Sequence, residues 1–268
     1  MDEAQAYLAR YKRITDPILR QYVDKQLCDS SRLGKTPQNV VSHMIKIVVG
    51  GKRIRGALMC LSYELCGGKD REIFSTSLFL ELFHAALLIH DDVIDRDEKR
   101  RGVSTIHSTF SDAMAINAGD LVYSWTLSYL FSSSFSADRL KRVAMLFASY
   151  FTKTMYGQIL DISAGETLDT IRLKTAEYTG VLSLLAGATL AGTRNKQTLD
   201  ALARYGRNLG MVFQIQDDIL DGNTIDGLVA VREHYYQKGI QSIKAVAKIK
   251  SFQNLLRSFL ALARNRKS

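Results

Sequence analysis

The chain has 268 residues, of which 46% are hydrophobic and 24% charged, so it can bury a large core and is not expected to be disordered. The formal net charge of +9 points to an anionic partner: a nucleic acid, an anionic membrane surface or a phosphorylated small molecule. The three cysteines lack zinc-like spacing, and no apolar run reaches the roughly 18 residues of a membrane span. The charged N-terminus is not a signal peptide. We therefore expect a cytoplasmic protein without a transmembrane segment.

The chain reads as a succession of amphipathic helices separated by short polar or glycine-containing breaks. Its two prolines, Pro17 and Pro37, lie near the start, and such sparse turn punctuation disfavours a β-rich fold. Pro17 falls inside the first helix, where a kink or a break is an option, and a loop is expected at 29–37. No linker and no strand-like alternation is visible, so residues 1–268 are predicted to form one all-α domain. The expected helices cover residues 3–28, 38–49, 54–66, 72–95, 109–131, 138–163, 170–192 and 197–221, with two more within 225–268.

Three carboxylates, Asp91, Asp92 and Asp95, end the apolar run from Leu82 to Ile89. On a helix, Asp91 and Asp95 lie one above the other, and like charges at that spacing are destabilising. A divalent cation or nearby arginines would compensate them. For one such motif alone, a solvated acidic helix end is an equally good interpretation.

A second cluster, Asp217, Asp218 and Asp221, repeats the spacing of the first, again after an apolar helical run. If the two helices are antiparallel neighbours in a bundle, the clusters would form facing carboxylate pairs. Oxygen ligands without His or Cys favour Mg²⁺ or Mn²⁺. Because Mg²⁺ is typically held by a few carboxylates together with substrate phosphates, the two clusters predict a diphosphate ligand.

A glycine-rich basic stretch at residues 50–56 reads Gly-Gly-Lys-Arg-Ile-Arg-Gly. Glycines permit close approach of a ligand, and the following helix start would offer N–H groups to an anion. Lys52 and Arg55 can share one helix face. Taken alone, the stretch is equally well a basic surface turn. His84 lies two turns before Asp91 and is either a core histidine or a hydrogen-bond donor to a bound anion.

These stretches resemble the signatures of the trans-isoprenyl diphosphate synthase family, which occur there in the same order. Further stretches, AINAGD (115–120), YGQILDI (156–162) and LKTAEY (173–178), resemble helical segments of that family. The resemblance covers residues 1 to 222 and, more loosely, the terminal helices. It implies a helical bundle of the isoprenoid synthase type with a central active-site cavity.

The activity implied is a Mg²⁺-dependent head-to-tail condensation of isopentenyl diphosphate with an allylic diphosphate to a trans-polyprenyl diphosphate. In the family all six aspartates serve catalysis, and three Mg²⁺ ions are bound. By resemblance, Asp91 and Asp95 bridge two ions, while Asp217 holds the third and Asp221 assists. Residues implied to touch the allylic diphosphate are Arg100, Lys174, Thr175 and Gln214, and those implied to bind isopentenyl diphosphate are Lys52, Arg55, His84 and Arg101.

The family also implies where product length is set, one to two turns before the first acidic motif. Ala86 is small there, whereas an aromatic residue at this position would stop chain growth at a fifteen-carbon product. Phe83 is the next obstacle, one turn deeper. We therefore expect geranylgeranyl diphosphate or a somewhat longer product.

The family pattern breaks after residue 222, where a polar loop and a Lys-containing segment usually follow. Here Asn223 leads directly into a sequence that resembles the terminal helices of the family. A loss of that segment leaves open a non-catalytic or modulatory subunit of a heteromeric synthase. A class I terpene cyclase fits the second motif poorly, and an RNA-binding bundle would need aromatics interleaved with basic residues. The family further implies a homodimer through helices around 109–131.

Overall fold

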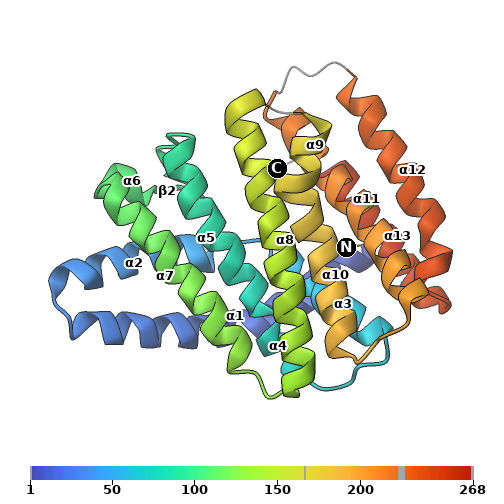
Figure 1. Cartoon of the computed structure of the whole chain (residues 1–268), viewed down its shortest axis with the longest axis horizontal. Helices are drawn as coiled ribbons and strands as arrows, with labels where there is room; N and C mark the ends of the chain where they lie inside the picture. Colours follow the sequence, from blue (N-terminus) through green and yellow to red (C-terminus); the bar gives the residue numbers. More distant parts are fainter. Residues whose placement is uncertain (1, 166, 223–226, 267–268) are drawn as a thin grey trace. The chain divides into compact units, whose positions relative to one another are not determined.

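The computed structural model describes residues 2–165, 167–222 and 227–266, and these form two compact units (Figure 1). The N-terminal unit consists of residues 10–56 and 74–134. The C-terminal unit consists of the described residues in 2–9, 57–73 and 135–266. Each acidic motif belongs to a different unit.

In the N-terminal unit, α5 packs along α7, and α2 contacts both of them (Figure 1). The core forms because α5 carries an almost unbroken apolar sequence, LFLELFHAALLI. The amphipathic helix α2 packs its apolar face, which includes Val41, Met44 and Val48, into the same core. The helices contributing to this unit are α1 (Glu3–Ser31, from residue 10 on), α2 (Lys35–Val49), the start of α3 (Ile54–Leu65), α4 (Glu72–Thr76, from residue 74 on), α5 (Leu78–Ile94), α6 (Ile106–Thr109) and α7 (Asp112–Phe131).

A two-stranded antiparallel hairpin follows α5, with β1 (Lys99–Arg100) paired to β2 (Val103–Ser104). Its two turn residues, Arg101 and Gly102, have φ angles of 55° and 80°. Two successive positive φ angles define the type I′ turn that suits the twist of a tight hairpin. The expectation of no strand was therefore wrong here, because an Arg-Gly pair is a weak turn signal compared with Asn-Gly.

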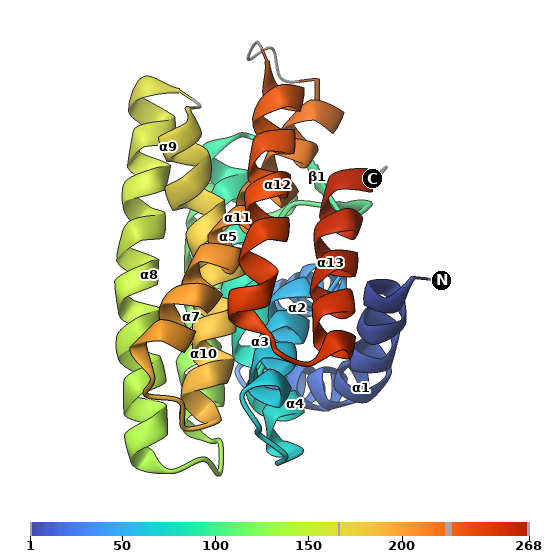
Figure 2. The same cartoon turned by 90° about the vertical axis from the view of Figure 1, so that its right-hand side faces the viewer.

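In the C-terminal unit, the π-helical segment η1 packs against both α8 and α11, and α11 also packs against α12 and α13 (Figure 2). Glycines allow this close packing. A Cβ on Gly180 would lie 1.9 Å from the carbonyl oxygen of Gly206, and one on Gly157 would lie 2.3 Å from the backbone nitrogen of Lys174. The elements are α8 (Ala137–Ala164), α9 (Leu168–Ile171), η1 (Arg172–Leu182), α10 (Ser183–Leu190), α11 (Lys196–Leu220), α12 (Leu228–Val246) and α13 (Lys250–Asn265).

The all-α expectation is confirmed, with local corrections. The loop expected at 29–37 is mostly helical, because α1 runs on to Ser31 and α2 begins at Lys35. Pro37 fits the first turn of α2, where no intrahelical N–H bond is required. Pro17 lies inside α1 without interrupting it.

Three predicted helices differ locally from the structure. The helix expected at 72–95 is interrupted at Ser77, and the one expected at 109–131 begins at Asp112, after the separate short helix α6. The segment expected at 170–192 contains the π-helical turns of η1. Periodicity alone does not show such departures, because the apolar spacing on either side of them is still helical.

The stretch Glu72–Ile94 is long and apolar enough to cross a membrane by length and composition, although it contains no uninterrupted apolar run of 18 residues. Within its most apolar 18-residue window, 72% is buried inside the protein. Burial of this kind is expected for the central helix of a packed core.

Candidate active site

The first acidic motif lies at the C-terminal end of α5. Asp91 is half-buried, Asp92 is buried and Asp95, the C-cap residue, is exposed. The N–H of Asp95 donates to the carbonyl of Asp91 at 2.8 Å. A helix C-terminus carries partial negative charge, so carboxylates placed there increase the demand for a cation.

Arg100 of the hairpin supplies one such cation. Its Nε donates to Oδ1 of Asp92 at 2.7 Å, and its Nη2 lies 2.6 Å from Oδ2 of Asp97. Burial raises the pKa of Asp92, while Arg100 acts in the opposite direction. Oδ2 of Asp92 is buried and has no hydrogen-bond partner within the part of the chain that the structure describes.

The second motif reproduces this arrangement at the end of α11. Asp217 is half-buried, Asp218 is buried and Asp221, again the C-cap residue, is exposed. Gln214 donates from Nε2 to Oδ1 of Asp218 at 2.8 Å. Asp217 forms an ion pair with Arg266, just beyond the end of α13. In both motifs the middle aspartate is buried and bonded to a neighbouring side chain, and the outer two are more exposed to solvent.

These carboxylates suit a hard divalent cation shared with a ligand. Among residues 2–165, 167–222 and 227–266, no three His, Cys, Asp or Glu side chains gather into a ready-made metal cage. Mg²⁺ does not need one, because it is usually held by one or two carboxylates, water and substrate phosphates. The all-oxygen donor set and the uncompensated oxygen of Asp92 fit such an ion.

The glycine-rich basic stretch differs from the expectation in two respects. Helix α3 begins at Ile54, so exposed Lys52 lies in the loop, and Lys52 and Arg55 do not share a helix face. The N–H of Gly56 donates to Oε1 of Glu81 at 2.9 Å. A buried carboxylate of α5 therefore takes a position at this helix start that was expected for an external anion.

A crowded group of cations surrounds His84 in the N-terminal unit. Burial lowers the pKa of His84 well below its ordinary value, and Arg55, Arg101, Arg100 and Arg53 lower it further. Burial also lowers the pKa of Arg101 to about 10; the Glu81 carboxylate opposes this shift, and Arg53, Arg55 and Arg100 add to it. Crowded, desolvated cations indicate a place where an anion would be stabilised.

The remaining predicted ligand residues lie in the C-terminal unit. Nζ of Lys174 is 2.7 Å from Oδ2 of Asp161 on α8, and Thr175 is half-buried on η1. Gln214 contacts Asp218, as described above. A π-helical segment that carries two predicted site residues is notable, because such segments are frequent at functional sites.

The two residues expected to set product length are both buried on α5. Phe83 is fully buried and its ring lies 6.5 Å, centroid to centroid, from that of Tyr123 on α7. Ala86 is 3% exposed and belongs to the same core. Their role in product length stays a prediction.

The structure thus brings some of the predicted residues together in one unit. Ten of them lie in the N-terminal unit and six in the C-terminal unit. The N-terminal residues are Lys52, Arg55, Phe83, His84, Asp91, Asp92, Asp95, Ala86, Arg100 and Arg101; the C-terminal residues are Lys174, Thr175, Gln214, Asp217, Asp218 and Asp221. The break predicted at Asn223 lies outside the described residues.

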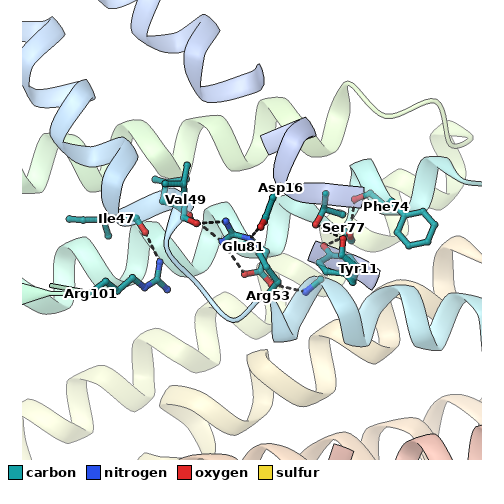
Figure 3. Close-up of polar contacts among 12 residues, drawn as sticks. Tyr11, Asp16, Ile47, Val49, Arg53, Phe74, Ser77, Glu81 and Arg101 are labelled. Carbon is teal, nitrogen blue, oxygen red and sulfur yellow. Dashed lines mark hydrogen bonds and ion pairs between the residues drawn. The ribbon is translucent and has the colours of Figure 1, made fainter. Parts of the chain in front are cut away.

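Sequence reasoning missed Arg53, Glu81 and Asp16, which form a polar network in which Arg53 and Glu81 are buried and Asp16 is partly exposed (Figure 3). A signal was available for Glu81. A single glutamate within the apolar run LFLELF must find a cationic or hydrogen-bonding partner if it is buried. The basic stretches on either side, at 50–56 and at 99–101, were the available sources of that partner.

Comparison with known proteins identifies the class. Residues 38–224 match the family model described as polyprenyl synthetase. The chain is 33% identical over 227 residues to a short chain isoprenyl diphosphate synthase of Methanothermobacter thermautotrophicus, which covers 82% of this chain and 67% of that protein. The chain therefore belongs to the polyprenyl synthetase family.

Other relatives agree. The chain is 36% identical over 185 residues to a geranylgeranyl diphosphate synthase of Cyanophora paradoxa, covering 64% of this chain and 61% of that protein. The chain spans only about 55% to 67% of the length of these and similar curated relatives.

A solved structure supports the fold. Geranylgeranyl pyrophosphate synthase from Corynebacterium glutamicum, complexed with isoprenyl diphosphate and magnesium, superposes with a TM-score of 0.87 at 22% identity, covering 97% of this chain and 99% of that one. The predicted isoprenoid synthase fold is confirmed by this similarity.

Proposed function

We propose that the protein is a prenyltransferase that condenses isopentenyl diphosphate head-to-tail with an allylic diphosphate. The family match and the relatives named as short chain isoprenyl and geranylgeranyl diphosphate synthases support this activity. One structural observation supports it most strongly. The guanidinium groups around neutral His84 belong to the same compact unit as the first acidic helix end. A cationic group for one diphosphate and a carboxylate cluster for a metal-bound one are what two diphosphate substrates require.

In this proposal Arg55, Arg101 and His84 hold the diphosphate of isopentenyl diphosphate, with exposed Lys52 as a further contact. Because His84 is neutral, it donates an N–H bond without adding to the repulsion among the arginines. Arg100, Lys174, Thr175 and Gln214 serve the allylic diphosphate.

Magnesium ions, when bound at Asp91 and Asp95 and at Asp217 and Asp221, would neutralise charge that develops on the departing diphosphate. The carbon–oxygen bond of the allylic substrate breaks, and the double bond of isopentenyl diphosphate forms the new carbon–carbon bond. The carbocation formed by this condensation then loses a proton to the diphosphate released from the allylic substrate. The chain's own share is orientation and charge stabilisation by Arg100, Arg101 and His84.

Several finer features of the proposal are predictions. The product is geranylgeranyl diphosphate or somewhat longer, three Mg²⁺ ions serve each site, and Mn²⁺ substitutes for them. The same proposal includes one isoprenoid-synthase domain per chain over residues 1–268, and a cytoplasmic homodimer of two such chains.

The decisive test incubates the purified protein with radiolabelled isopentenyl diphosphate, an allylic primer and Mg²⁺. We expect Mg²⁺-dependent incorporation into a product of about twenty carbons, separated by chain length. Asp91→Asn and Asp217→Asn variants should lose most of it, by about 10²-fold or more each, a loss of the size expected when charge stabilisation is removed. No incorporation by the protein alone would instead favour a modulatory subunit, which none of the relatives reported above is named as.

A further inference from the structure

We propose that Arg53, fixed by Asp16 and Glu81, is a positioning residue that sets the shape of the isopentenyl diphosphate loop, residues 50–56, without touching the substrate (Figure 3). The inference rests on the function proposed above and assigns the one arginine of the loop that the site has not absorbed. Arg53 differs from Lys52 and Arg55 in its backbone, its burial and its partners.

The backbone of Arg53 is strained. Its φ angle is 61°, in the left-handed region that residues with a Cβ rarely occupy. It is the last residue before α3 begins at Ile54. Strain at a single position persists only where the surroundings fix it, so contacts of the side chain must hold this turn in place.

The side chain supplies those contacts, and it points into the protein. It is 2% exposed, and its Nε donates to Oδ1 of Asp16 on α1 at 3.0 Å. Nη1 donates to the carbonyl of Val48 at 3.3 Å and Nη2 to that of Val49 at 2.6 Å, which are the last two carbonyls of α2. The guanidinium thus caps one helix and joins it to another.

Glu81 completes the network from α5. Its Oε2 lies 4.0 Å from Nη1 of Arg53, and its Oε1 accepts the N–H of Gly56. The carboxylate therefore holds both ends of the turn into α3. On the other side, the Tyr11 hydroxyl lies against Gly56, where an added Cβ would come within 2.0 Å of it, and this hydroxyl is hydrogen-bonded to Ser77 at 2.7 Å.

The same network reaches the proposed substrate residue Arg101. A Cβ on Gly51 would lie 2.9 Å from Nη1 of Arg53 and 3.2 Å from Nη2 of Arg101, so Gly51 lies between the two side chains. Nη1 of Arg101 donates to the carbonyl of Ile47 in the last turn of α2. Three successive carbonyls at the end of α2 therefore orient one arginine for the ligand and one for the loop (Figure 3).

The test uses Asp16→Asn, with Asp24→Asn on the exposed part of α1 as a matched control. Binding of pyrophosphate and of isopentenyl diphosphate is measured by calorimetry, together with KM for each substrate. By its effect on charge alone, removal of a carboxylate near an anion site should strengthen anion binding. The control Asp24→Asn should therefore leave pyrophosphate binding unchanged or slightly stronger. We expect Asp16→Asn to weaken it by about 10- to 100-fold, the range of one hydrogen bond to a charged group, with kcat and the allylic KM within about twofold of wild type.

Arg53→Met and Arg53→Lys should raise KM for isopentenyl diphosphate further, and hydrogen exchange of the amides at 54–57 should accelerate in every network variant. Unchanged or tighter pyrophosphate binding in Asp16→Asn would overturn the inference, as would unchanged amide exchange in Arg53→Met. A wild-type protein that neither binds nor turns over isopentenyl diphosphate would refute the proposed function instead. In that case the amide exchange still reports on whether Arg53 holds the loop.

Discussion

At the scale of single residues, His84 and Asp92 show how burial shifts the pKa of a side chain. His84 stays neutral because burial and surrounding guanidinium groups both oppose a second positive charge. Asp92 has a raised pKa from burial, although Arg100 is bonded to it. An anion bound near His84 and a cation bound near Asp92 would each oppose the shift in pKa of that residue.

The lowered pKa of His84 predicts a specific loss of stability in acid. Below pH about 6.5 the unfolded chain protonates this histidine and the folded protein does not, so the unfolded state binds more protons. As the pH decreases, protonation of this histidine in the unfolded chain should lower the free energy of unfolding by up to about 1.4 kcal/mol per pH unit. Urea unfolding at pH 7.5 and 5.5 should show a smaller loss for His84→Gln than for wild type. His234→Gln, at an exposed position of α12, should follow wild type; parallel curves for all three proteins would contradict the assignment.

The pair Phe83 and Ala86 predicts opposite changes in product length. Phe83→Ala removes a buried ring from α5 and should give longer products, while Ala86→Phe adds one and should shorten them to about fifteen carbons or fewer. Chromatography of the products by chain length measures both. Because Phe→Ala in a core costs about 3–5 kcal/mol, Phe83→Leu serves as the milder variant. An unchanged product distribution in both directions would rule out this wall.

At the scale of elements, the helices follow from apolar periodicity, and the deviations follow from contacts that periodicity does not contain. The π-helical register of η1, the break at Ser77 and the hairpin at 99–104 all depend on the partners each segment packs against. The order and positions of the site motifs were predictable because acidic and basic residues have distinct spacings. The inward network of Arg53 and Glu81 was not, because it requires knowing that α1, α2 and α5 meet. That the two acidic motifs face one another stays a prediction.

The close packing of η1 on α11 predicts that Gly180→Ala is strongly destabilising. The new methyl group would meet the carbonyl oxygen of Gly206, a backbone atom that cannot move aside. We expect a loss of about 1–3 kcal/mol in the free energy of unfolding, as for other overpacked cores. Gly239→Ala on α12 is the matched control, since its methyl group would meet only the flexible end of Leu260. Equal urea midpoints for the two variants would contradict this account.

At the scale of the whole molecule, the outer face of α7 supports the predicted homodimer. Met114 and Leu121, two turns apart and therefore on the same side of the helix, are each 39% exposed. Apolar side chains gathered on one helix face are more often covered by a partner than left in water. Some exposed apolar surface is normal, so the face must be tested directly.

Replacement of Met114 and Leu121 by lysine should convert the dimer to a monomer in light scattering coupled to size exclusion. Charges placed inside an apolar interface lose solvation without gaining partners. Leu33→Lys, at a position that is 78% exposed between α1 and α2, should leave the mass unchanged. A wild-type protein that is already monomeric would remove the prediction.

The hairpin after α5 has a consequence for how the two ligands affect each other's binding. Arg100, the last residue of β1, contacts the first acidic motif, and the next residue, Arg101 of the turn, contacts the end of α2. Under the proposed function these neighbours serve different substrates. Occupancy of one site then shifts affinity at the other, and by thermodynamic linkage the shift is reciprocal. Equilibrium titrations of each ligand, with and without the other, should therefore give a coupling factor that differs from one and is equal in the two directions.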